Sequence, residues 1–175
     1  MNTLLDIGRI AGRFAWLEDR IADMTGAWVA TVDNSDARLV LGARSHTHAW
    51  HADLWRDRIP AVPGLDTSSF IAPAHDDLAH ALDHVAALDT TIERMVALHR
   101  MLLPRLVTAY ALLLRGTNEL IDAPTVRTLR LVLEDTREEA REGEMVIRSL
   151  DMDPDADAAE ARLVPVIDAA GPLGA

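Results

Sequence analysis

The sequence predicts an all-α protein built as a four-helix bundle. Apolar residues recur at alternating three- and four-residue steps along four long segments, which is the periodicity of helices that bury one face. No period-two alternation of useful length is present, so we expect no sheet. A long connection rich in proline separates the second segment from the third. With 175 residues, 49% of them hydrophobic, the chain is long enough to bury one core.

The first two predicted helices carry the most informative polar residues. The first runs from about Thr3 to Val29, and the second starts after the turn at 33–36, where Ser35 or Asp36 can cap it. The second helix continues to Arg58, because the residue before a proline is pushed out of helical geometry. The inward stripe of the first helix is Ile7, Ala11, Phe14, Glu18, Ile21, Thr25 and Trp28, and that of the second is Leu41, Ser45, His48, Ala52 and Trp55.

A crossover connects the second and third core helices. It contains the helix breakers Pro60, Pro63, Gly64 and Pro73 and then a short extra helix at 76–88. Thr90-Thr-Ile-Glu93 has the spacing of a capping box and begins the third core helix, which Pro104 should kink. The third inward stripe is Ile92, Val96, His99, Leu103, Leu106, Tyr110 and Leu113.

The fourth helix follows a stop at Gly116 and starts at Asp122-Ala-Pro-Thr, with an acidic cap and an early proline. Its inward stripe is Val126, Leu129, Leu133, Thr136, Ala140, Gly143, Ile147 and Leu150. Asp151-Met-Asp-Pro154 should end it. We therefore divide the chain into a bundle at 1–150 and an acidic C-terminal tail at 151–175, with one short helix around 158–164.

Composition excludes several classes of function. The chain has no cysteine and no lysine, which excludes a thiolate nucleophile, a sulfur-ligated metal and a lysine Schiff base. A net charge of −11 would repel a phosphate backbone, so we expect no nucleic-acid partner. Charged residues interrupt the first apolar segment, and no uninterrupted apolar run approaches the roughly 20 residues of a membrane span. We expect a cytoplasmic protein without a membrane partner.

The segment Ala43-Arg-Ser-His-Thr-His-Ala-Trp-His-Ala-Asp-Leu-Trp-Arg-Asp-Arg-Ile-Pro60 concentrates candidate site residues. His48 lies in the middle of an apolar stripe, with His51 one turn beyond it, and a buried histidine needs a metal, a carboxylate or a substrate as partner. Glu18 is costly on the apolar stripe of the first helix unless it is paired. We predict that Glu18 and His48 face each other, whereas His46 should be solvated.

The fourth helix carries a resemblance to a known family. Leu133-Glu-Asp-Thr-Arg-Glu-Glu-Ala-Arg-Glu-Gly143 resembles the fourth-helix motif Asp-Glu-x-x-His…Gly of the ferritin-like superfamily, which includes small di-iron carboxylate oxygenases. The resemblance covers roughly residues 1–150 and implies a ferritin-like bundle with a long crossover. In such proteins two helices each supply one carboxylate, and the other two each supply a Glu-x-x-His pair.

The ligand set that the resemblance implies is incomplete here. Glu18 and His48 match expected ligands, whereas Ser45 and Thr136 stand where the family has glutamate, and Glu139 stands where it has histidine. The matching level of the third helix holds Leu103, Pro104 and Arg105, with no acid. The resemblance thus implies no two-metal centre. Two alternatives stay open: one iron or manganese ion held by Glu18, His48 and Glu139, with His51 or His99 as further candidates, or no metal.

We hypothesise that the chain is a small ferritin-like enzyme acting on an organic molecule between the helices. The reaction would be oxidative with a metal and acid/base without one, and its candidate catalytic residues are Glu18, His48, His51, His99 and Tyr110. The alternative is a metal-free, non-catalytic scaffold that binds a small ligand or a partner protein. In that case His48 would be a core histidine bonded to Glu18 or Tyr110, with His51 at the rim, and Glu139 would belong to a surface ladder of charges.

Two weaker signals complete the sequence predictions. His80 and His84, with Asp77 and Asp83 nearby, could hold a surface metal, although a solvated helix explains them more simply. Trp16 and Trp50 lie off their stripes, so a monomer should leave both partly exposed, and we predict a homodimer that covers them. Trp50 and Trp55 could also wall a ligand pocket.

Overall fold

The computed structural model describes residues 4–61, 63–150 and 153–173, and these residues form helices and connecting loops without a strand. The predicted all-α class is confirmed. The α-helices are α1 Leu4–Val29, α2 Ser35–Arg56, α3 Asp76–Ala86, α4 Thr91–Val96, α5 Leu103–Gly116, α6 Ala123–Ser149 and α7 Asp153–Ala169. A 3-10 helix, η1, covers Thr67–Phe70, and a π-helix, η2, covers Ala97–Leu102. Thr3, Asp151 and Met152, where we predicted helix ends, lie outside the described residues.

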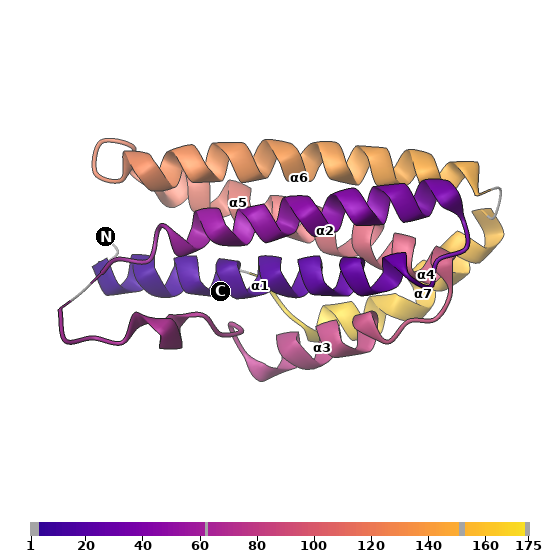
Figure 1. The fold of residues 1–175 in the computed structure, drawn as a ribbon, viewed down its shortest axis with the longest axis horizontal. Helices are drawn as coiled ribbons and strands as arrows, with labels where there is room; N and C mark the ends of the chain where they lie inside the picture. The colour runs from indigo at the N-terminus through magenta and orange to yellow at the C-terminus, as the bar shows by residue number, and fades with distance from the viewer. Residues whose placement is uncertain (1–3, 62, 151–152, 174–175) are drawn as a thin grey trace.

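The long helices α1, α2, α5 and α6 lie side by side (Figure 1). α1 packs against α2, α5 against α6, and α2 against α6. Most residues of their predicted inward stripes are buried in the core, which contains the fully buried rings of Phe14, Trp55 and Tyr110, whereas others, among them Ile7 and Ser45, are only partly buried. These three rings stack between α1, α2 and α5, with centroids 4.8–5.7 Å apart.

Side-chain caps fix where the helices begin. Thr90 accepts a hydrogen bond from the backbone N–H of Glu93, and Asp122 accepts one from Thr125, as the sequence predicts. The cap of α2 is Asn34, whose side chain accepts from the backbone N–H groups of the next turn. Our assignment of this cap to Ser35 or Asp36 was therefore one or two residues late, because both lie inside the helix.

A π-helix precedes Pro104 in the third core helix. α4, η2 and α5 follow one another without a break. The π-helix ends at Leu102, two residues before Pro104, and the N–H of Leu103 donates a hydrogen bond to the carbonyl of Leu98. In a regular α-helix the proline ring would clash with the carbonyl of Arg100. The turn before the proline is instead a π-turn, in which each hydrogen bond connects residues five apart in the sequence rather than four.

η1, α3 and α7 cover one side of the long helices (Figure 1). The Cβ position of Gly12 lies only 2.2 Å from the carbonyl oxygen of Phe70, so η1 can approach α1 this closely because residue 12 is a glycine. α7 is longer than the short helix predicted at 158–164, and it packs against α3, α4 and η2. Its buried residues Ala159, Leu163 and Ile167 belong to the same core cluster as the long helices.

Among the described residues, one helical stretch could cross a membrane by length and apolar composition. It is Thr91–Gly116, the third core helix, and half of its most apolar window is buried inside the structure. Core helices of globular proteins pass the same test, so this is weak evidence for a span. We predicted no span because no uninterrupted apolar run is long enough.

The predicted exposure of two tryptophans agrees with the structure. Trp50 is 46% exposed and Trp16 is half-buried. The segment between the second and third core helices could have folded over both rings, but Trp50 remains exposed to solvent. The predicted homodimer would cover this indole, and light scattering at micromolar concentration should then report twice the monomer mass. A clean monomer mass over that concentration range would contradict the dimer.

Candidate functional site

Glu18 is the centre of a buried polar cluster. It lies midway along α1 on the predicted inward stripe, and its side chain is fully buried. The hydroxyl of Tyr110 on α5 donates a hydrogen bond to Glu18 Oε1, and the indole N–H of Trp55 donates to the Tyr110 oxygen at 3.2 Å. Residues of α1, α2 and α5 therefore share one chain of hydrogen bonds that ends at this carboxylate.

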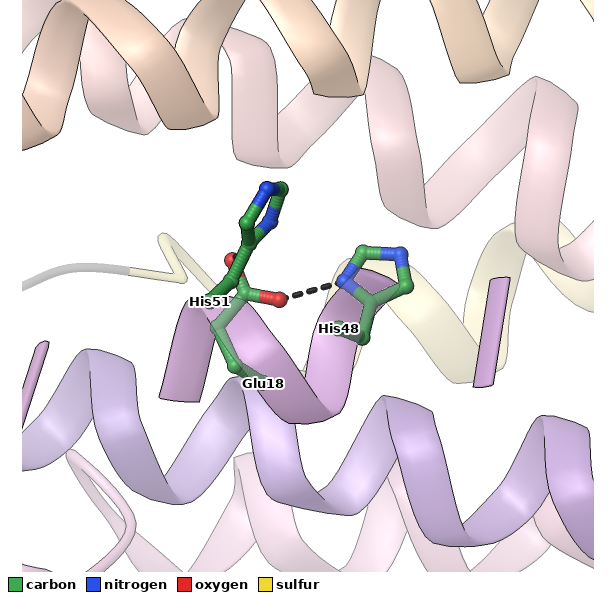
Figure 2. A group of neighbouring side chains, drawn as sticks. All are labelled: Glu18, His48 and His51. Carbon is green, nitrogen blue, oxygen red and sulfur yellow. Dashed lines mark hydrogen bonds and ion pairs between the residues drawn. The ribbon is translucent and has the colours of Figure 1, made fainter. Parts of the chain in front are cut away.

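Two histidines of α2 approach the same carboxylate (Figure 2). His48 Nδ1 forms a hydrogen bond with Glu18 Oε2, and His51 Nδ1 lies 3.6 Å from Glu18 Oε1. Their spacing of three residues places both rings on one face of α2, and both side chains are fully buried. The predicted contact between Glu18 and His48 is confirmed, and the alternative that left His51 at the rim is wrong, because His51 is inside the cluster.

The outer nitrogen of each imidazole faces a carboxylate from α6. His51 Nε2 donates to Asp135 Oδ2 at 3.1 Å. His48 Nε2 lies 3.2 Å from Glu139 Oε2, without the alignment of a hydrogen bond. Each ring therefore lies between Glu18 on one side and a second acid on the other.

Arg44 extends this row of charges. Its guanidinium contacts Glu139 Oε1 at 2.9 Å and also pairs with Glu142. Positive and negative groups alternate from Asp135 through His51, Glu18 and His48 to Glu139, Arg44 and Glu142. Glu139 is only 2% exposed and does not belong to a surface ladder of charges.

The close packing of opposite charges shifts the pKa values of the cluster. Burial alone would raise the pKa of Glu18, but the positive charge of His48, its hydrogen bond to Glu18 and the nearby ring of His51 lower it to about 2. Burial alone would lower the pKa of His48, but the charges of Glu18 and Glu139 raise it to about 10. The pKa of His51 is also raised, since its interactions with Glu18 outweigh its burial.

We predict that the metal-free protein is most stable near pH 6.5. The pKa of buried His99 is lowered to about 3, so the folded state becomes less stable relative to the unfolded state as the pH falls below 6.5. The lowered pKa of Glu18 contributes stability that is complete above 4.5 and is lost as the pH falls toward 2. The raised pKa of His48 contributes stability that is complete below 6.5 and is lost as the pH rises toward 10. Urea unfolding midpoints measured from pH 3 to 9 test this. A stability that keeps rising from pH 6.5 to 9 would contradict it.

Glu18, His48 and His51 can together hold a metal ion. One donor atom from each of the three side chains lies within 4.8 Å of the others. One carboxylate with two imidazoles is a donor set of catalytic zinc and of mononuclear iron sites. The carboxylates behind the two rings match the outer partners that orient metal-bound histidines. Nδ1 of His51, which faces Glu18, has no hydrogen-bond partner.

The structure brings together most of the predicted site residues. Tyr110 donates directly to Glu18. Glu139, which we predicted as a metal ligand, lies beside Nε2 of His48, on the far side of the ring from Glu18. His51 instead of Glu139 is the third residue of the group of close donors. His99 does not reach Glu18. Its Nδ1 donates to the backbone carbonyl of Glu139 at 3.1 Å, and burial together with the charge of Arg44 lowers its pKa to about 3.

Sequence reasoning missed Arg44 and Asp135. Arg44 lies four residues before His48 on the same face of α2, and Asp135 lies four residues before Glu139 on α6. That spacing was a usable signal, but charged residues at the edge of a stripe are usually solvated. His46 is exposed, as predicted. His80 and His84 are also exposed, and Asp83 beside them pairs with Arg20, so the structure favours the simpler interpretation of a solvated helix.

No family model, curated protein or solved structure matches the chain.

Proposed function

We propose that this chain is a ferritin-like four-helix bundle that binds one divalent transition-metal ion through Glu18, His48 and His51. The observation that carries the proposal is the buried group of three donors, with Asp135 and Glu139 behind its two imidazoles. Burying three ionisable groups in a helix core is costly, and a ligand that uses all three would explain why they lie together. Iron and manganese are the metals we propose.

Several contacts support one ion rather than two. Arg44 already supplies positive charge to Glu139 and Glu142. The hydroxyl groups of Ser45 and Thr136, which stand where the ferritin-like motif has glutamate, donate to backbone carbonyls of Ala22 and Val132. Neither residue adds a negative charge that a second ion would require.

The proposed activity is oxidation of a small organic molecule. A bound iron or manganese ion would supply redox and Lewis-acid chemistry. Tyr110 is bonded to Glu18, and its pKa is well above the ordinary value because of burial and the neighbouring carboxylate. Tyr110 would therefore stay protonated and act as a hydrogen-bond donor rather than as a base.

The competing proposal is a metal-free scaffold that binds a ligand or partner. It is favoured by the alternation of charges, because protonated His48 and His51 already neutralise Glu18 without a metal. In this case the cluster would only fix the register of α1, α2 and α6. Catalysis, if present, would be limited to acid/base chemistry.

Metal analysis separates these two proposals. Protein prepared without a histidine tag and incubated with Mn²⁺ or, without air, Fe²⁺ should retain about one ion per chain after gel filtration. His51→Ala should lose the ion, whereas the matched control His46→Ala, an exposed histidine on the same helix, should keep it. Retention of two ions per chain inside the bundle, or equal retention by the two variants, would contradict the one-ion site. Protein that retains no ion favours the scaffold.

A further inference from the structure

A second candidate site lies at one end of the molecule, away from the buried charges. The start of α1, the end of α2 and the turn between α5 and α6 meet at this end (Figure 1). They enclose a hollow of about 160 Å³. Its walls include the apolar side chains of Ile7, Ile10, Trp55, Leu113 and Ile121.

The size and walls of this hollow fit a single aromatic ring. A dry, apolar cavity of about 150 Å³ in another protein is known to bind benzene. Trp55, which is only 1% exposed, lines the hollow, and its ring is held in place by stacking on Phe14 and Tyr110. An aromatic ligand would thus meet a rigid surface, which keeps the entropy cost of binding low.

The rim of the hollow is polar and acidic. Thr117, Asn118, Asp122 and Thr125 line it where α5 turns into α6. Asp122 Oδ1 accepts the N–H of Thr125, and the Asn118 side chain accepts the N–H of Leu120, so both side chains are fixed by the turn. A carboxylate on the rim favours a ligand that donates a hydrogen bond and disfavours an anion, as does the net charge of −11.

We propose that this hollow is a binding site for a small neutral aromatic molecule of phenol size, with its ring among the apolar side chains of the lining and its hydrogen-bond donor toward Asp122. The site is independent of the proposed metal ion, because its lining contains none of the three metal-binding side chains. It is nevertheless connected to them. The Trp55 indole donates to Tyr110, which donates to Glu18, so the wall of the hollow and the buried cluster share one chain of hydrogen bonds.

Three probes of similar shape test the ligand class on metal-free, full-length protein. Phenol has the ring and the donor, toluene has only the ring, and benzoate carries a negative charge. The reporter is the NMR signal of the Trp55 indole N–H, which lies in the wall. Phenol should shift this signal saturably, toluene should bind about five- to tenfold more weakly for want of one hydrogen bond, and benzoate should bind at least tenfold more weakly. Benzoate binding as tightly as phenol, or no saturable shift with any probe, would overturn the proposal.

Filling the hollow provides a second test. Gly116 lines the hollow, and a Cβ atom added there meets no heavy atom within 4 Å, so Gly116→Leu enlarges a lining residue without a clash at Cβ. It should weaken phenol binding at least tenfold, and Ala11→Val, at a second lining residue, should do the same. Arg115→Leu adds the same side chain at the neighbouring, exposed position outside the lining and should leave binding unchanged. Equal binding by all three variants would move the ligand elsewhere and refute the site.

Discussion

Replacing Glu18 by alanine is expected to lower the free energy of unfolding of the metal-free protein by about 3 kcal/mol. The substitution leaves His48 and His51 buried without the carboxylate that they share, and Tyr110 loses its acceptor. Removing one partner of a buried ion pair typically costs about 3–5 kcal/mol. We expect the lower end of that range because Glu139 still neutralises His48 from its other side.

Two comparisons make this result specific to the buried pair. Glu134→Ala, an exposed acid on α6, should change stability by no more than about 0.5 kcal/mol. The cost of Glu18→Ala should also shrink between pH 6 and 9.5, because the wild-type protein loses the contribution of His48 as the pH approaches its pKa of about 10. Urea unfolding of both variants at the two pH values measures this. A Glu18→Ala cost that matches Glu134→Ala would contradict the role of the pair.

Much of this site could be predicted from the hydrophobic periodicity of the sequence. The stripe of α1 contains a single acid, Glu18, and the stripe of α2 contains His48, so two mid-helix positions on neighbouring helices could be expected to meet. Tyr110 is likewise on the stripe of α5, and it contacts Glu18. Periodicity reports which face of a helix is buried, and each of these residues lies on such a face.

Contacts between residues at the edges of the buried helix faces could not be predicted from periodicity. The pairing of Arg44 with Glu139, and of Asp135 with His51, depends on how α6 is rotated and shifted against α2. A single helix pattern contains no information on that offset. The same holds for α7, whose stripe of small and apolar residues became interpretable only once its packing on α3 and α4 was known.

The π-helix could not be predicted from the periodicity of the sequence either, and His99 lies within it. Pro104 predicts a disturbance in the third core helix but not its position or its form. The π-helix falls at Ala97–Leu102 and carries His99 against α6, at the level of Gly143. The resemblance to the ferritin-like motif drew attention to Gly143 as part of a motif, whereas the structure gives it a physical role as the space for an imidazole.

Replacing Gly143 by alanine is therefore expected to destabilise the protein by about 2–3 kcal/mol, even though alanine is the better helix former. A Cβ atom at this position would lie 1.9 Å from Cγ and 2.0 Å from Nδ1 of His99. The ring cannot move freely, because it is 2% exposed and its Nδ1 donates to the carbonyl of Glu139. The gain in helix propensity from glycine to alanine is only about 1 kcal/mol, so the steric cost of the clash with His99 should exceed it.

The matched control is Gly42→Ala, also within a long helix, where an added Cβ lies 3.9 Å from Val29, an ordinary contact. Gly42→Ala should stabilise the protein by up to about 1 kcal/mol. In the background of His99→Ala, the substitution Gly143→Ala should lose its penalty, because the ring that it strikes is gone. Urea unfolding of the two single variants and the double variant gives this coupling energy directly. Equal effects of Gly143→Ala with and without His99 would show that the imidazole does not occupy the space left by the glycine.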